Sequence, residues 1–237
     1  MDNKFIVYAH RGASEYCPEN TMLSFYTGVY MGANGIETDI QRTKDGVLVL
    51  FHDSTVTRMM GVEKNLADMT YKELLSYPMT TDGRVDYIIT LEDFLIHFGK
   101  FDLTFALELK GPGVEEETAE LIRKYGLEDK VIVTSFKYEY LLNFRKAAPD
   151  IRLGYLTYGK FINDELLAKM KEDGIGEICP KATDVTAELV ADWHERGFNV
   201  RAWGVSNEEL MRKVYDDGCD GTTVNFPDKL IEYIASK

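Results

Sequence analysis

Short apolar runs alternate with amphipathic helical patterns along almost the whole chain, and this alternation restricts the fold more than any other feature of the sequence. The strand-like runs are residues 5–9, 35–40, 103–109, 131–136, 151–156, 177–179, 199–203 and 221–224. The helical patterns are residues 21–31, 91–98, 114–125, 138–147, 163–173, 186–196, 207–217 and 227–235. Repeated β-then-α units in steps of about 30 residues predict an α/β protein of the (β/α)8 TIM barrel class.

An open doubly wound sheet is the competing architecture, because it uses the same alternation. Its dinucleotide-binding form carries a GxGxxG fingerprint after the first strand, and the residues that follow residues 5–9 do not contain it. The helical patterns also have suitable ends, with the N-cap residues Asn163 and Thr186 and the closing glycines Gly174 and Gly197. A length of 237 residues suits one barrel, so we predict a single domain over residues 1–237.

One segment interrupts the repeat, between the second strand and the second helix. It begins with the turn Thr43-Lys44-Asp45-Gly46, continues with an apolar strand at residues 47–51, and includes a helical pattern at residues 70–75. We interpret residues 43–88 as a small insertion. A long connection after a barrel strand lies over the active face, so the insertion is expected to contribute to substrate binding. The alternative is a surface loop without a role.

Charge and cysteine content limit the partners and the compartment. A net charge of −13 disfavours nucleic acid and stable association with anionic membranes, so an anionic substrate must be attracted by a local site. Cys17, Cys179 and Cys219 lack disulfide or zinc spacing and are interpreted as reduced thiols. The sequence carries no signal-peptide pattern and no membrane-length apolar run, so a cytoplasmic location is expected. The oligomeric state is left open.

Polar residues end several predicted strands, which is where a barrel places its active site. In chain order they are His10-Arg11-Gly12, Glu37-Thr38-Asp39, His52-Asp53 and Glu108-Leu109-Lys110. Side chains two residues apart on a strand point to the same face. Glu37 and Asp39 are therefore expected to project together, as are Glu108 and Lys110.

Glu37, Asp39 and Glu108 form a candidate metal site. Three neighbouring carboxylates repel one another, and a divalent cation relieves that repulsion. A ligand set of oxygens suits Mg2+ or Ca2+ better than zinc, and Mn2+ also fits it. The alternative is that these carboxylates form salt bridges with lysine or arginine at the barrel rim.

His10 and His52 are the candidate proton-transfer groups. The other two histidines, His97 and His194, lie in helical patterns and are interpreted as structural or surface residues. Two imidazoles on one rim beside a carboxylate cluster favour general acid–base catalysis near neutral pH. Metal ligation by His10 and His52 is the alternative.

The ordered set of motifs resembles the glycerophosphodiester phosphodiesterase family. Residues 10–21, HRGASEYCPENT, are similar to that family's HRG…PENT opening. Its following motifs are matched in order by Glu37-Thr38-Asp39, His52-Asp53, Glu108-Leu109-Lys110, Val200-Arg201-Ala202-Trp203 and Asp220-Gly221…Asn225-Phe226-Pro227. The resemblance covers essentially the whole chain.

The resemblance implies metal-dependent hydrolysis of a small glycerophosphodiester to sn-glycerol 3-phosphate and an alcohol. It implies Glu37, Asp39 and Glu108 as metal ligands, His10 and His52 as the acid–base pair, and Arg11 and Lys110 as phosphate-binding residues. From its place at the end of the seventh strand, Trp203 is a candidate apolar wall for the substrate, with core packing as the alternative. Two other functions stay open, namely a lipid-directed phosphodiesterase of the phospholipase C or D type and a non-enzymatic phosphodiester-binding barrel.

The chain departs from the family pattern at two places. Where members often read WTVN, it reads Trp203-Gly204-Val205-Ser206-Asn207, and Asn225 stands where an aspartate is common. We expect these departures to affect the choice of substrate and not the metal or acid–base residues. Asn20 can cap the first helix, with Glu19 supporting the rim, and a role in the site is the alternative for both residues.

Overall fold

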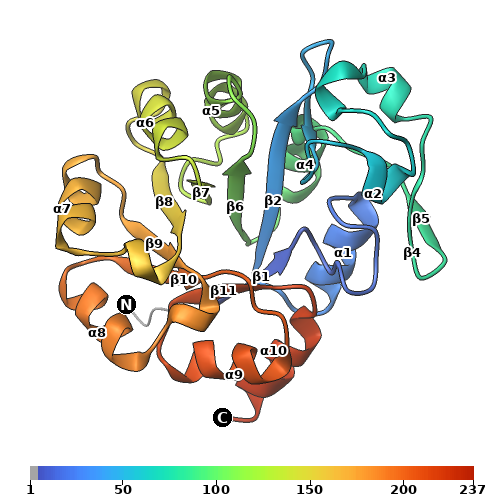
Figure 1. Ribbon diagram of the computed structural model, residues 1–237. Coiled ribbons are helices and arrows are strands. Elements are labelled where there is room, and N and C mark those ends of the chain that lie inside the picture. The colour runs from blue at the N-terminus through green and yellow to red at the C-terminus, as the bar shows by residue number, and fades with distance from the viewer. Residues whose placement is uncertain (1–4) are drawn as a thin grey trace.

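A closed barrel of parallel strands forms the centre of the computed structural model, which describes residues 5–237 (Figure 1). The strands run in the order β1-β11-β10-β9-β8-β7-β6-β2, and β2 pairs with β1 to close the barrel. Their bounds are β1 Ile6–His10, β2 Gly35–Arg42, β6 Thr104–Leu109, β7 Val131–Ser135, β8 Arg152–Thr157, β9 Glu177–Pro180, β10 Asn199–Ala202 and β11 Gly221–Val224. The barrel prediction is confirmed, and the closing pair excludes an open sheet.

Helices surround this barrel and bury their apolar faces against it (Figure 1). They are α1 Met22–Tyr30, α4 Leu91–Phe98, α5 Glu115–Lys124, α6 Tyr138–Ala147, α7 Asp164–Glu172, α8 Ala187–Glu195, α9 Glu208–Asp216 and α10 Pro227–Ala235. The short 3-10 turns η2 (Gly159–Phe161) and η3 (Ala182–Asp184) follow β8 and β9. The Asn163 and Thr186 side chains cap α7 and α8 as predicted. No helix within residues 5–237 is long and apolar enough to cross a bilayer.

The cap of α1 differs from the prediction. Thr21, and not Asn20, accepts the Ser24 backbone N–H and forms a capping box with it. Asn20 has a left-handed backbone with a φ of 57°, and its side chain turns toward the barrel. Asparagine tolerates this conformation better than most residues. It therefore acts in the barrel interior and not at the helix end.

The register of the barrel strands places the candidate site residues next to one another. β1 pairs with β2 so that His10 lies beside Glu37, and β2 pairs with β6 so that Asp39 lies beside Glu108. Neighbouring strands of a parallel sheet lie about 4.8 Å apart, so these side chains meet at one end of the barrel. The residues come from positions up to about a hundred apart in the chain, and only barrel closure brings them together.

The segment between β2 and α4 forms a small unit at the carboxyl end of β2 (Figure 1). β3 (Leu48–Leu50) pairs antiparallel with the end of β2, which continues past the other barrel strands. The remaining elements are α2 (Thr57–Met60), η1 (Leu66–Asp68), α3 (Tyr71–Leu74) and the hairpin of β4 (Met79–Thr81) and β5 (Arg84–Asp86). This unit has its own apolar cluster, which includes Phe51, Leu66 and Leu74. It can therefore hold polar side chains rigidly over the barrel mouth.

Candidate active site

A cavity opens at the carboxyl ends of the barrel strands. Its lining comprises His10, Arg11, Glu37, His52, Glu108, Thr134, Phe136, Leu156, Arg201, Trp203, Gly204 and Thr223. The structure thus brings most of the predicted site residues to one pocket. Asp39 and Lys110, the other two, contact its walls through ion pairs and hydrogen bonds described below.

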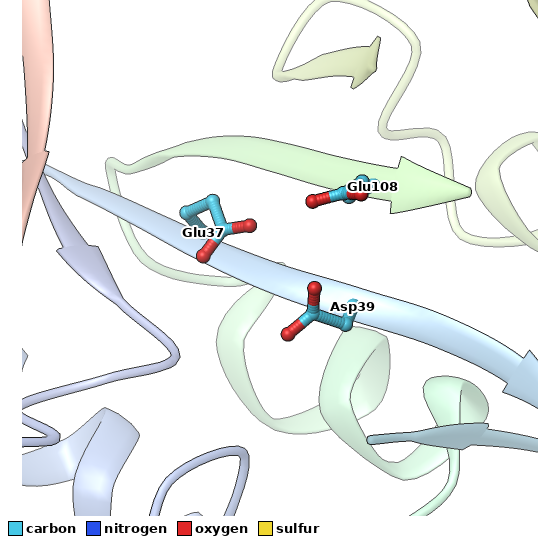
Figure 2. A group of neighbouring side chains, drawn as sticks. All are labelled: Glu37, Asp39 and Glu108. Carbon is cyan, nitrogen blue, oxygen red and sulfur yellow. The ribbon is translucent and has the colours of Figure 1, made fainter. Parts of the chain in front are cut away.

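Three buried carboxylates converge at the base of this cavity. One oxygen each from Glu37, Asp39 and Glu108 lies within 4.8 Å of the others, and all three residues are less than a tenth exposed. Figure 2 shows the three side chains extending from β2 and β6 toward a common space. This spacing suits ligation of a single divalent cation by oxygen ligands.

The salt-bridge alternative is realised only in part. Arg11 Nε lies 3.1 Å from Asp39 Oδ2, and Lys110 Nζ lies 3.1 Å from Glu108 Oε1 and 3.8 Å from Asp39 Oδ1. Glu37 accepts the Arg11 backbone N–H at 3.2 Å, and its Oε2 lies 3.8 Å from His10 Nε2, a pair that is ionic only when the imidazole is protonated. Two cationic side chains therefore face three acids.

Electrostatics also favour a cation here. Burial, followed by the charge of Asp39, raises the pKa of Glu37 well above its usual range and that of Glu108 to about 7. Burial opposes ionisation of Asp39 as well, but the charges of Arg11, His52 and Lys110 outweigh it and lower the Asp39 pKa. Asp39 Oδ1 is buried without a hydrogen-bond donor. The mutual repulsion of these carboxylates and the buried oxygen without a hydrogen bond fit a divalent cation in the cluster.

These shifts predict that metal affinity depends on pH. A carboxyl group must lose its proton to bind a cation, and Glu108 is half protonated near pH 7. Lowering the pH from 8 to 6 should therefore weaken Mn2+ binding, by about tenfold per pH unit below 7 for each proton displaced. Isothermal titration calorimetry in buffers of differing ionisation enthalpy measures both the affinity and the proton release. A pH-independent affinity would contradict this electrostatic description.

The two histidines have different partners on their Nδ1 atoms. His10 Nδ1 lies 2.6 Å from the Asn225 side-chain oxygen Oδ1, and His52 Nδ1 lies 2.6 Å from Asp53 Oδ1. Both oxygens accept, so each Nδ1 carries the proton and each Nε2 is left for chemistry. Burial, followed by the positive charge of Arg11, lowers the pKa of His10 to about 4. His10 is thus neutral at pH 7.

Asn225 corrects one expectation. The departure from aspartate at this position was expected to leave the acid–base residues unaffected, but Asn225 contacts His10 directly. An amide oxygen fixes the tautomer of an imidazole without placing a negative charge behind it. The departure therefore acts on His10 and not only on the choice of substrate.

Two further polar residues support the site: Asn20, for which the sequence left a site role open, and Arg201, to which it assigned no role. The Asn20 amide donates to Asp39 Oδ2 at 3.0 Å, and its oxygen accepts from the Thr38 hydroxyl at 2.7 Å. Arg201, 1% exposed, lines the cavity and donates from Nε to Glu177 Oε1 at 2.8 Å. The sequence feature that could have indicated this buried ion pair is Arg201 itself, a charged residue between the apolar residues Val200 and Ala202 of β10.

Trp203 lies in the cavity wall within an aromatic group. Its ring meets Phe136 and Tyr158 edge-on, with ring centroids 4.9 and 5.3 Å away. Its Nε1 donates to the Thr157 carbonyl at 3.1 Å, which fixes the orientation of the ring. The same cavity thus combines an apolar wall with charged groups, as in pockets that bind small polar molecules with a carbon skeleton.

Fold and site together define a barrel enzyme with a cavity suited to an anionic substrate and a divalent cation. The model of the glycerophosphoryl diester phosphodiesterase family matches residues 10–229. The chain belongs to this family and is an enzyme, a phosphoric diester hydrolase. The non-enzymatic alternative is therefore not supported.

Individual relatives agree with this assignment. The chain is 31% identical over 244 residues to the glycerophosphodiester phosphodiesterase of Caldanaerobacter subterraneus, with 98% of each chain covered. It is 31% identical over 236 residues to that of Bacillus altitudinis, covering 95% of this chain and 96% of the relative. A phosphodiesterase of Oleispira antarctica, solved in complex with the product sn-glycerol-3-phosphate, superposes with a TM-score of 0.88 at 25% identity, covering 97% of this chain and 96% of that one.

Proposed function

We propose that the chain hydrolyses small glycerophosphodiesters to sn-glycerol 3-phosphate and an alcohol, in a reaction that depends on a divalent cation held by Glu37, Asp39 and Glu108. The observation that carries this proposal is the convergence of these carboxylates and two imidazoles on one cavity. The product bound to the Oleispira antarctica relative supports the choice of substrate. Mg2+, Ca2+ and Mn2+ all suit the oxygen ligands.

Charge neutralisation comes first in the proposed mechanism. A phosphodiester monoanion repels nucleophiles, and a bound divalent cation would supply Lewis-acid stabilisation of its oxygens. Arg11 and Lys110 lie beside the carboxylates with side chains 15% and 19% exposed. They are therefore placed to bind the phosphate oxygens from the same side.

Proton transfer is assigned to the two histidines, with different roles. His10 is neutral and its Nδ1–H is held by Asn225, so Nε2 suits removal of a proton from water or from a neighbouring glycerol hydroxyl. His52 donates its Nδ1–H to the Asp53 carboxylate, which orients the imidazole so that Nε2 can deliver a proton to the departing alcohol. Trp203 would contact the carbon skeleton of the glycerol or of the alcohol. We also propose that residues 1–237 act as one domain, with the insertion at 43–88 completing its active face.

A substrate panel tests this function. Purified protein is incubated with glycerophosphocholine, glycerophosphoethanolamine and glycerophosphoglycerol, each with Mg2+, Ca2+ or Mn2+, and released sn-glycerol 3-phosphate is measured by a coupled assay. We expect equimolar alcohol and sn-glycerol 3-phosphate with at least one metal. Failure with every combination, together with turnover of phospholipid vesicles, would instead favour the lipid-directed alternative.

A further inference from the structure

Arg58, on α2 of the insertion, contacts two carboxylates that each hold a proposed functional group. Its Nε donates to Asp53 Oδ2 at 2.6 Å, while its two terminal nitrogens donate to both oxygens of Glu19, at 2.6 and 2.9 Å. Asp53 binds His52 through its other oxygen, and Glu19 accepts from Arg11 NH1 at 3.0 Å. The Arg58 guanidinium thus begins two branches of contacts, one through Asp53 to His52 and one through Glu19 to Arg11.

The geometry of this contact is specific to arginine. A planar guanidinium offers donors in a fixed fork, and here its three nitrogens are shared between two acids on different elements. Both acids are ionised at neutral pH. Burial opposes their ionisation, but Arg58 together with Arg11 lowers the pKa of Glu19, and Arg58 together with His52 brings the pKa of Asp53 to about 2.

A purely stabilising role explains this arrangement poorly. The Arg58 side chain is 48% exposed, and ion pairs at that exposure contribute little to the free energy of unfolding. Its partners, however, contact residues in the wall of the cavity, where small displacements of a reacting group have large kinetic effects. The contact therefore matters more for orientation than for stability.

We propose that Arg58 is a positioning residue, through which the insertion fixes the orientation of the His52 imidazole by way of Asp53 and of the Arg11 guanidinium by way of Glu19. This inference rests on the proposed roles of His52 and Arg11. It gives the insertion a function beyond covering the barrel, because the rigid unit around α2 supplies the residue that aligns both groups.

The test compares Arg58→Gln with a matched control, Arg42→Gln. Arg42 also joins the insertion end of β2 to the barrel helices, through Glu117 at 2.7 Å, but it has no contact with His52 or Arg11. We expect Arg58→Gln to lower kcat by about tenfold or more and Arg42→Gln to change it by less than about twofold, with similar small changes in Tm. Arg58→Lys should restore only part of the loss, because an ammonium lacks the planar fork.

A double mutant shows whether Arg58 acts through Asp53. In an Asp53→Ala background the link to His52 is already broken and only the branch through Glu19 to Arg11 remains, so Arg58→Gln should lower kcat by a clearly smaller factor than it does in the wild-type background. Equal factors in both backgrounds, or equal kcat for Arg58→Gln and Arg42→Gln, would overturn the inference. If His52→Ala kept full turnover, only the proposed role of His52 would fail, whereas failure of the wild-type protein in the substrate panel would remove the proposed function itself.

Discussion

Alanine at His10 or at His52 is expected to lower kcat by about 10² or more. Each substitution removes one of the two imidazoles that line the cavity and to which proton transfer is assigned in the proposed mechanism. His97→Ala is the matched control, because this histidine lies on α4 and bonds to the Tyr26 hydroxyl at 3.2 Å. Steady-state kinetics at saturating metal measure the effect. Full turnover by both cavity mutants would contradict the assignment.

A comparison of substrates with different leaving groups can distinguish the general acid from the general base. A nitrophenolate departs without needing a proton, whereas an alkoxide must be protonated as it leaves. With glycerophosphoryl p-nitrophenol as substrate, His52→Ala should therefore recover most of its lost activity, while His10→Ala should not. The reverse pattern would exchange the roles of acid and base.

Removal of the metal is expected to have the other large effect. Chelation should abolish turnover, and adding back a divalent cation should restore it, because the proposed mechanism relies on the cation to neutralise the phosphodiester charge. Glu37→Gln should raise the metal concentration for half-maximal activity by at least about tenfold. Glu120→Gln, at an exposed position on α5, is the control. Full activity in metal-free protein would rule out this dependence.

The net charge of −13 is compatible with an anionic substrate because several cationic side chains lie at the cavity. Arg11 and Arg201 line the cavity, and Lys110 contacts two of its carboxylates. Charges in a low-dielectric cleft act locally, while distant surface charges are screened by salt. With the proposed divalent cation added to these side chains, attraction of the phosphodiester would be local to this pocket and not a property of the whole surface.

The barrel and the carboxylate cluster were predictable from sequence because they depend on local patterns. The alternation of strands and helices predicted the order of the elements, and the spacing of Glu37 and Asp39 predicted a shared face on β2. Their approach to Glu108 also required β2 and β6 to be neighbours, which follows from the barrel topology. Pattern and topology together thus located the cluster.

The supporting contacts were not predictable in this way. Asn225 lies 215 positions from His10 and reaches it only because β11 pairs with β1. Arg58 reaches Glu19 across 39 positions through the irregular path of the insertion, which no periodicity describes. Asn20 and Thr21 are both residues that cap helices, and only the backbone angles decide between them. Side-chain direction in loops depends on tertiary structure and not on local spacing.

The most direct test of the central claim is a crystal structure of the Mn2+-soaked protein with anomalous data collected at the manganese edge. We expect one strong peak within about 2.0 to 2.6 Å of oxygens from Glu37, Asp39 and Glu108, with His10 and His52 facing the same cavity. Absence of an anomalous peak at the cluster, with its carboxylates paired only to Arg11 and Lys110, would contradict the proposed metal site.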